Sequence, residues 1–197
     1  IKNLNLRNSI FVDNTANEDI AHTYPPFLKS SISVVTCNKI AAAETYEYYS
    51  HLKQLARTYN APYLFETNVG AGLPIIDTLN HLITSGDKVH TIQAILSGSL
   101  NFVFNEFNDK TTFREVVQQA MDAGFTEPDP KIDLSGVDVA RKILILARES
   151  GLQMELSDIE NESFLPQECL DTKDNESFLS SLDDHNDHFK SLFSSAA

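Results

Sequence analysis

Short apolar runs alternate with longer amphipathic stretches over the first third of the chain. Three runs are typical of buried strands, namely Ile10 to Val12, Ile32 to Thr36 and Tyr63 to Phe65. Between the first two, Glu18 to Lys29 favours a helix that Pro25-Pro26 breaks or re-aims. Between the last two, apolar residues recur at helical spacing from Tyr49 to Tyr59, after a possible N-cap at Thr45. Strands that alternate with helices predict an α/β fold with a parallel sheet.

The middle of the chain has a different pattern. Pro74 suits the first turn of a helix with apolar positions from Ile75 to Ile83. Val89 to Leu96 is typical of a strand, so we expect this part to be α+β. Two more helices are expected, one from the capping box Thr112-x-x-Glu115 to Gly124 and one from Ser135 to Ser150. A proline-rich acidic loop separates them, and the second helix should be buried because it carries four consecutive apolar residues.

The last part of the chain, beyond residue 155, is acidic and rich in serine. Phe178, Leu182, Phe189 and Leu192 still allow amphipathic helices there, and we expect a surface helix pair.

Composition and charge narrow the class of protein. The chain has 197 residues, of which 42% are hydrophobic and 22% charged, so a globular protein with a sizeable core is expected. A net charge of −13 argues against a nucleic-acid partner. No apolar run approaches the roughly 20 residues needed to span a bilayer, and no signal peptide opens the chain, so no membrane association is expected. Cys37 and Cys169 alone make no disulfide framework, which favours a reducing, cytoplasmic setting.

The densest candidate chemistry lies between Gly124 and Lys142 (G-F-T-E-P-D-P-K-I-D-L-S-G-V-D-V-A-R-K). Asp138 and Lys142 are four residues apart in an expected helix and therefore share a face. On spacing alone, an exposed ion pair is the more common explanation. The stiff acidic loop before the helix can instead clasp an ammonium group, and a lysine beside it can protonate a carbonyl oxygen. Metal binding by these carboxylates is a weaker alternative, because no calcium-loop pattern is present.

A strand-to-helix turn with two glycines, E-T-N-V-G-A-G-L-P, begins at Glu66. Three interpretations stay open. It resembles a dinucleotide loop, but Ile75 takes the place of the third glycine. Its carbonyl oxygens can surround a hard cation. It can also be a simple turn.

Three further segments follow strands, where α/β sites collect. V-V-T-C-N-K ends at Lys39, which can also be an ordinary solvated lysine. D-N-T ends at Thr15, and L-S-G-S-L-N begins at Leu96. A nucleophilic Cys37 would indicate an acylating aldehyde dehydrogenase, but no Cys-His pairing pattern supports that class.

Taken together and in this order, the segments resemble homoserine dehydrogenases over about residues 10–166. T-E-P-D-P-x-x-D-L-S-G-x-D-V-A-R-K, with an apolar helix and A-R-E after it, is similar to the family signature. It is more like the form fused behind aspartate kinase than the stand-alone form. The resemblance implies an NAD(P)-dependent oxidoreductase of threonine and methionine biosynthesis. The reaction would be the reversible reduction of L-aspartate 4-semialdehyde to L-homoserine.

The resemblance also implies roles for individual residues. Lys142 would give a proton to the aldehyde oxygen, and Lys39 would help to polarise the aldehyde. The substrate would meet Glu127, Asp138, Asp133, Gly98, Ser99 and Phe125. The cofactor, NADP or NAD, would meet Thr15, Asn38 and Lys39. A monovalent cation, Na⁺ or K⁺, would be held by Glu66 and the backbone oxygens of Val69, Ala71 and Leu73.

Two positions depart from the family pattern. The family usually has Tyr where this chain has Phe125, and Asp where it has Ile132. The first change removes a hydroxyl that would face the substrate. We expect both to alter fine substrate contacts and to leave the reaction class unchanged.

The resemblance divides the chain into three expected parts. Residues 1–70 would be the rear, C-terminal part of a nucleotide-binding Rossmann-like domain. Residues 71–165 would be a substrate-binding and dimerisation domain, and residues 166–197 an acidic, partly helical tail leading back to the nucleotide domain. No G-x-G-x-x-G occurs among the seven glycines, so we expect that loop before residue 1 and an inactive isolated chain. The alternatives are a non-catalytic folding or homodimerisation module and a different semialdehyde oxidoreductase.

Overall fold

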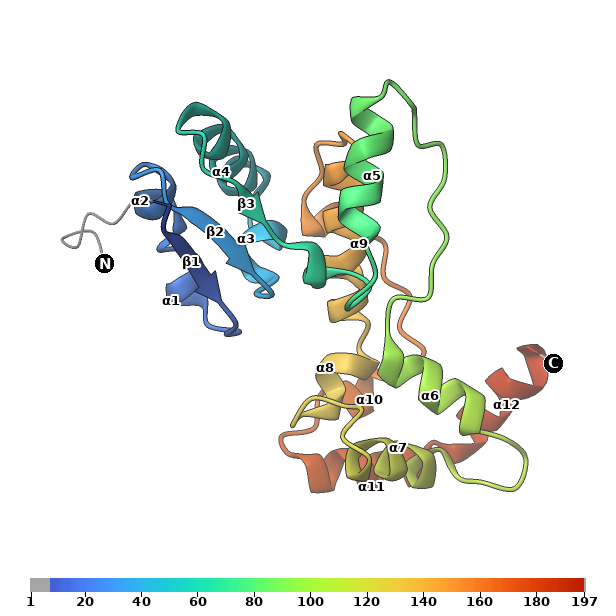
Figure 1. Ribbon diagram of the computed structural model, residues 1–197. Coiled ribbons are helices and arrows are strands. Elements are labelled where there is room, and N and C mark those ends of the chain that lie inside the picture. The colour runs from blue at the N-terminus through green and yellow to red at the C-terminus, as the bar shows by residue number, and fades with distance from the viewer. Residues whose placement is uncertain (1–7, 197) are drawn as a thin grey trace. The chain divides into compact units, whose positions relative to one another are not determined.

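The computed structural model describes residues 8–196 (Figure 1). These residues form two compact units, which are described separately. Of the described residues, the first unit comprises 8–93 and Arg141–Glu160, and the second comprises Ala94–Ala140 and 161–196. The long helix α9 (Val137–Glu149) supplies residues to both. Within the described part of the chain, no helix is long and apolar enough to cross a membrane.

The first unit contains the predicted parallel sheet. Its strands are β1 (Ile10–Asp13), β2 (Ser33–Thr36) and β3 (Tyr63–Leu64), in the spatial order β1-β2-β3. Both pairings are parallel, and Val34 of β2 is opposite Phe11 on one side and Tyr63 on the other. The α/β fold class expected from the alternating pattern is therefore confirmed.

Helices connect the strands and follow the sheet. In the first unit they are α1 (Glu18–Ala21), α2 (Tyr24–Leu28), α3 (Ile40–Ala43), α4 (Tyr46–Thr58), η2 (Glu66–Asn68), α5 (Ile75–Thr84) and η3 (Leu156–Asp158). Thr45 caps α4 as predicted, since its side chain accepts a hydrogen bond from the Tyr48 amide. Pro25 and Pro26 stand in the first turn of α2, where prolines are tolerated, so the expected break lies just before them.

The two faces of the sheet have different surroundings. One face carries Phe11, Val34 and Tyr63, and Phe11 stacks on Phe27 with ring centroids 4.2 Å apart. The opposite face carries Val12 of β1 and Leu64 of β3, whose exposed fractions are 57% and 54%. Within the described residues, only the first face of the sheet is covered.

A buried carboxylate joins the carboxyl ends of β1 and β2. Asp13, the last residue of β1, is 2% exposed and lies opposite Thr36 of β2. Its carboxylate accepts hydrogen bonds from the backbone and hydroxyl of Thr15 at 2.8 and 2.7 Å, from the Tyr24 hydroxyl, and from the Asn38 amide at 3.1 Å. Tyr24 also lies 3.0 Å from the Thr36 hydroxyl. This cluster links two strand ends to helix α2.

The hydrogen bonds outweigh the effect of burial on Asp13. Burial raises the pKa of its carboxyl, but the bonds from Tyr24, Thr15 and Asn38 together hold the pKa below 3.8. Burial and the neighbouring Asp13 carboxylate raise the pKa of Tyr24 well above its usual range. Asp13 is therefore charged and Tyr24 is neutral near pH 7.

Two charged residues anchor the C-terminal end of α9 in the first unit. The Arg148 side chain is fully buried and donates to the carbonyl oxygens of Ala42, Glu44 and Met154, and to the Glu155 carboxylate. Burial lowers the pKa of Arg148, while the charge of Glu155 opposes this shift.

The neighbouring Glu149, 5% exposed, is held by a second set of partners. Its carboxylate accepts from Tyr49, from Lys53 at 2.9 Å and from Asn80 at 2.9 Å. The A-R-E that closes the signature is thus a buried polar anchor.

Among the described residues of the second unit, all regular secondary structure is helical. The helices that lie wholly within it are α6 (Gly98–Glu106), α7 (Phe113–Asp122), α8 (Pro130–Leu134), α10 (Gln167–Leu170), α11 (Asn175–Asp184) and α12 (Asn186–Ala196). The predicted capping box of Thr112 and Glu115 begins α7. In the core of the second unit, the Phe113 and Phe189 rings stack with centroids 4.0 Å apart. Phe178 and Leu182 are fully buried there.

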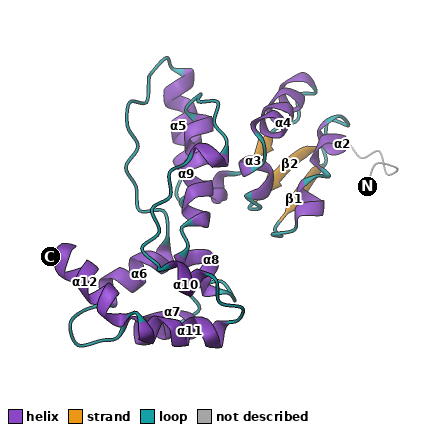
Figure 2. Ribbon diagram, turned by 180° about the vertical axis from the view of Figure 1, so that it is seen from behind, coloured by secondary structure: helices purple, strands orange, loops and turns teal. Residues whose placement is uncertain are grey.

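Three expectations need correction. Residues 89–96 form a loop, not a strand (Figure 2), because no strand pairs with them in the described part of the chain. The proline-rich acidic segment contains α8, since Asp129 caps it and Pro130 fits its first position. The helices α11 and α12 are part of the core of the second unit and not a surface pair, because Phe178, Leu182 and Phe189 are buried in it.

We predict that Arg148→Ala lowers the free energy of unfolding by about 3 kcal/mol, because several buried carbonyl oxygens lose their donor at about 1–3 kcal/mol each. Urea unfolding followed by circular dichroism measures the change. Arg57→Ala is the control, since Arg57 lies exposed on α4. A difference under about 1 kcal/mol between the two variants would show that Arg148 is no anchor.

We predict that Asp13→Asn destabilises the chain by about 1–3 kcal/mol at pH 7, since an amide cannot accept all four hydrogen bonds. A carboxyl whose folded pKa is depressed stabilises the fold above its unfolded value and loses that effect as the pH falls through the folded pKa. The difference from wild type should therefore shrink below pH 3.8. Urea unfolding at several pH values tests this, with the exposed Asp19→Asn as control. A pH-independent difference contradicts the assignment.

Candidate functional site

The residues predicted to meet the cofactor lie just past β1 and β2, at the carboxyl ends of these parallel strands. Thr15 is exposed and is held by the Asp13 cluster. Lys39 is half-buried and stands at the N-cap position of α3. Ligands of open α/β sheets bind at this edge, so the placement of both residues suits a nucleotide site.

The side chain of Asn38, which was also predicted to bind the cofactor, makes hydrogen bonds within the protein. It is 2% exposed. Its amide nitrogen donates to Asp13 at 3.1 Å and to the Asn17 carbonyl at 3.0 Å, while its amide oxygen accepts from the Ile40 backbone at 3.1 Å. The side chain therefore orients the segment that carries Lys39. The Asn38 backbone is engaged as well, since its amide donates to the Thr36 hydroxyl at 2.8 Å and its carbonyl accepts from the Asn68 side chain at 3.5 Å.

The glycine turn places Glu66 at the start of α5. Its two carboxylate oxygens accept from the backbone amides of Ile76 and Asp77, each at 2.8 Å. Gly70 has φ +80°, and a Cβ there would meet Ile75 at 2.6 Å, so this position requires glycine. Ala71 shares the left-handed conformation, with φ +53°.

The oxygens of this turn are hard donors. The Leu73 carbonyl oxygen accepts a hydrogen bond from the Ile75 amide at 2.9 Å. Among the described residues, no backbone amide donates to the carbonyl oxygen of Val69 or of Ala71. A carboxylate and carbonyl oxygens are the donor set of a hard cation. The residues of the turn therefore fit such an ion.

In the second unit, Asp133 of α8 joins two of the predicted substrate residues. One of its oxygens accepts from the Ser99 hydroxyl at 2.9 Å, and the other accepts from the Glu127 backbone amide at 2.8 Å. Ser99 lies 3.0 Å from the Ser97 hydroxyl, which caps α6. Gly98, the first residue of α6, is exposed, as is the Glu127 side chain. Asp133 thus positions this segment, and Glu127 is the carboxylate that solvent reaches.

Helix α9 carries the predicted proton donor. Asp138 in its first turn and Lys142 one turn later share a helix face, and both are half-buried. The other polar pair of this helix, Arg148 and Glu149, is buried at its far end. The C-terminal end of the helix is thus a buried structural anchor, whereas Asp138 and Lys142 near its start are partly exposed to solvent.

The two departures from the family pattern lie on exposed positions. Phe125 is 52% exposed and packs on Phe102 with ring centroids 4.8 Å apart. Ile132 is 45% exposed.

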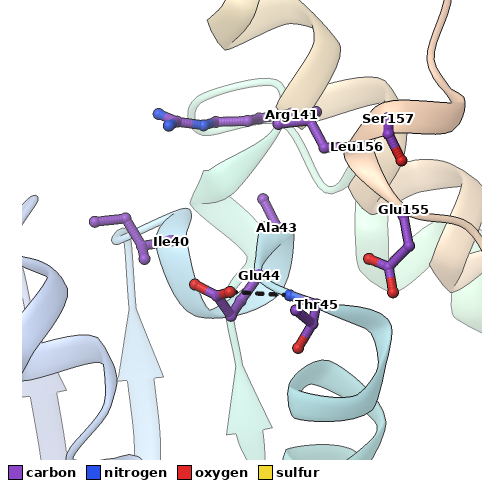
Figure 3. A pocket seen from close by; sticks show the side chains of 8 residues that line it. All are labelled: Ile40, Ala43, Glu44, Thr45, Arg141, Glu155, Leu156 and Ser157. Carbon is purple, nitrogen blue, oxygen red and sulfur yellow. Dashed lines mark hydrogen bonds between the residues drawn. The ribbon is translucent and has the colours of Figure 1, made fainter.

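A cavity of about 460 Å³ opens in the first unit (Figure 3). Its lining residues are Ile40, Ala43, Glu44, Thr45, Arg141, Glu155, Leu156 and Ser157. In Figure 3 the Arg141 side chain extends toward the side of the view on which Ile40 lies. None of the sequence-predicted site residues lines the cavity. Two lining residues are their neighbours in sequence, because Ile40 follows Lys39 and Arg141 precedes Lys142.

The two cysteines differ in their surroundings. Cys37 is exposed. Cys169 is buried, 3.7 Å from the His185 ring, a pairing that sequence spacing did not indicate. Burial raises the pKa of the Cys169 thiol, which disfavours the thiolate that a nucleophile needs.

Sequence reasoning missed the positioning residues. Asp13 was identified only as part of the turn before Thr15, and Tyr24 was not singled out. Arg148 and Glu149 were quoted only as part of a motif. A charged pair at the end of an apolar helix was the available signal, since buried charges require partners.

Two family models match the chain. "Homoserine dehydrogenase, NAD binding domain" matches residues 1–66, and "Homoserine dehydrogenase" matches residues 74–193.

Curated relatives match over most of the chain. It is 45% identical over 189 residues to the bifunctional aspartokinase/homoserine dehydrogenase of Haemophilus influenzae, covering 96% of this chain and 23% of the relative. It is 38% identical to the homoserine dehydrogenase of Schizosaccharomyces pombe, covering 93% of this chain and 50% of that protein. The chain thus spans half or less of these relatives' lengths.

Solved structures share the fold. A Candida auris protein described as of unknown function matches with TM-score 0.88 and 38% identity, covering 96% of this chain and 55% of that one. A hyperthermophilic archaeal homoserine dehydrogenase in complex with NADPH matches with TM-score 0.65 and 33% identity, covering 72% and 43%. Sequence, family models and fold agree, and the chain belongs to the homoserine dehydrogenase family.

Proposed function

We propose that the protein catalyses the reversible NAD(P)-dependent reduction of L-aspartate 4-semialdehyde to L-homoserine. The observation that supports this most directly is helix α9. It presents Asp138 and Lys142 on one face and directly follows the Asp133 junction with Ser99 and Glu127. A carboxylate for an ammonium group and a lysine for a carbonyl oxygen are what this substrate requires.

Each residue has a proposed role. Lys142 donates a proton to the aldehyde oxygen as it gains charge, and Lys39 polarises the same bond. Glu127 and Asp138 bind the substrate ammonium group. Asp133 is a positioning residue, because its two oxygens are already engaged by Ser99 and Glu127. Gly98 allows close approach of the substrate backbone, and Phe125 offers an apolar contact where a hydroxyl is usual.

The cofactor is NADPH or NADH, which supplies the hydride when bound. Thr15 and Lys39 would contact it at the carboxyl edge of the sheet, and Asn38 would hold the segment that carries Lys39 in place. The archaeal relative's structure in complex with NADPH supports this class of cofactor. The exposed sheet face with Val12 and Leu64 is where further elements of a complete nucleotide domain would pack.

A monovalent cation, Na⁺ or K⁺, would be held by Glu66 and the carbonyl oxygens of Val69, Ala71 and Leu73. Because Glu66 also caps α5, the ion would fix the turn between the sheet and that helix. The proposed assembly is a homodimer or a higher homo-oligomer, in a cytoplasmic setting.

We predict that Lys142→Ala, in the full-length gene product, lowers kcat by about 100-fold or more, because general-acid assistance contributes about 10²–10⁴-fold. The KM for homoserine should change much less. Steady-state kinetics in both directions measures this, with the exposed Lys29→Ala as control. A kcat within about tenfold of wild type would rule out Lys142 as the proton donor.

We predict that Na⁺ or K⁺ raises the Tm of the chain above its value in tetramethylammonium chloride of equal ionic strength, since an ion that binds only the folded state stabilises it. Glu66→Gln should abolish this difference, whatever its effect on the Tm itself. Glu47→Gln, in the exposed first turn of α4, should retain it. An undiminished difference in Glu66→Gln would exclude this turn as the site.

A further inference from the structure

Three potential metal ligands gather on the first unit, and none of them has a role in the proposed reaction. Glu18 and His22 lie one helical turn apart at α1, and Glu44 follows the last residue of α3. One ligand atom from each lies within 4.8 Å of the others, the sole such group among the residues that the structure describes. The His22 Nε2 atom is 3.7 Å from Glu44 Oε2.

The packing of the unit orients two of the three side chains. The His22 ring meets the Tyr48 ring edge to face, with centroids 5.3 Å apart, and the Tyr48 hydroxyl donates to the Ala21 carbonyl at 2.9 Å. Glu44 Oε1 accepts from the Thr45 amide at 3.2 Å, a bond drawn in Figure 3. Its other oxygen is thereby turned toward His22. The imidazole and one carboxylate thus each have a contact that orients them toward one another.

The distances suit a small transition-metal ion. With bonds of about 2.1 Å, the ligand atoms around a tetrahedral Zn²⁺ lie about 3.4 Å apart. His22 and Glu44 need to approach by only a few tenths of an ångström. Glu18 is exposed, so a change of its side-chain rotamer can close the remaining gap.

We propose that Glu18, His22 and Glu44 form a divalent transition-metal site, with Zn²⁺ as its preferred ion and water completing the coordination. The imidazole nitrogen selects zinc over Mg²⁺ and Ca²⁺, which prefer oxygen ligands. Both carboxylates are available to balance the charge of the ion. The proposal is independent of the dehydrogenase reaction.

The competing explanation is a surface ion pair between a protonated His22 and Glu44. Their side chains are 43% and 32% exposed, so such a pair would contribute little to stability. This explanation gives Glu18 no role. The chain contains a matched example, because His81 and Asp77 on α5 form an i,i+4 pair at 3.8 Å. That pair belongs to no three-ligand group among the described residues.

The test is a calorimetric titration of Zn²⁺ into the 197-residue chain, with Mg²⁺ titrated in parallel. Binding of Zn²⁺ should weaken at least about tenfold in His22→Ala and in Glu44→Gln. The glutamine retains an acceptor for the Thr45 amide but loses its anionic ligand, so its folding should be preserved. His81→Ala should bind as wild type does. Co²⁺ in place of Zn²⁺ should give visible absorption that the same two variants lose.

The titrations decide whether these residues form a metal site. Weaker binding in His22→Ala and Glu44→Gln, with His81→Ala unchanged, supports the site. Unchanged Zn²⁺ binding in His22→Ala, an equal loss in His81→Ala, or no Zn²⁺ binding by the wild-type chain overturns it. Thermal unfolding of each variant without metal confirms that the comparison is between folded proteins.

Discussion

The buried carboxylate of Asp13 is the interaction on which the arrangement of the first unit depends. Two parallel strands bring their following segments to one edge of the sheet only if their ends are held in register. Asp13 does this by accepting hydrogen bonds from its own turn at Thr15, from Tyr24 in α2 and from Asn38 after β2. A buried charge with fewer donors would cost several kcal/mol, so the donors and the carboxylate require one another. The position of Lys39 follows from this cluster.

Helix α9 carries both a structural anchor and the residues proposed for the chemistry. Arg148 and Glu149 are buried at its C-terminal end, and each is satisfied by several partners. Asp138 and Lys142 are only half-buried, near its start. The sequence motif contains both pairs, and it does not tell which pair is structural. The structure assigns Arg148 to the anchor, because a guanidinium surrounded by carbonyl oxygens cannot also bind a substrate.

Much of the fold could be predicted from residue patterns. The three strands, the caps of α4 and α7 and the helix after Pro74 all follow local rules that were confirmed. The strand expected at residues 89–96 failed because a strand depends on a neighbour, which no local pattern supplies. The core role of α11 and α12 was missed for a similar reason. Their apolar residues show an amphipathic face, but not that Phe189 stacks on Phe113, more than seventy residues earlier in the chain.

The order of residues was enough to establish the family, the fold class and the positions where chemistry is expected, because motifs and periodicity are properties of short segments. Tertiary packing assigned those residues their partners. It engaged Asn38 and Asp133 in positioning, placed Glu66 at the start of α5, and gathered Glu18, His22 and Glu44 from two helices. The physical reason is the same in each case. Hydrogen bonds and coordination depend on distances between atoms that are remote in sequence, and these distances are set only when the core has packed.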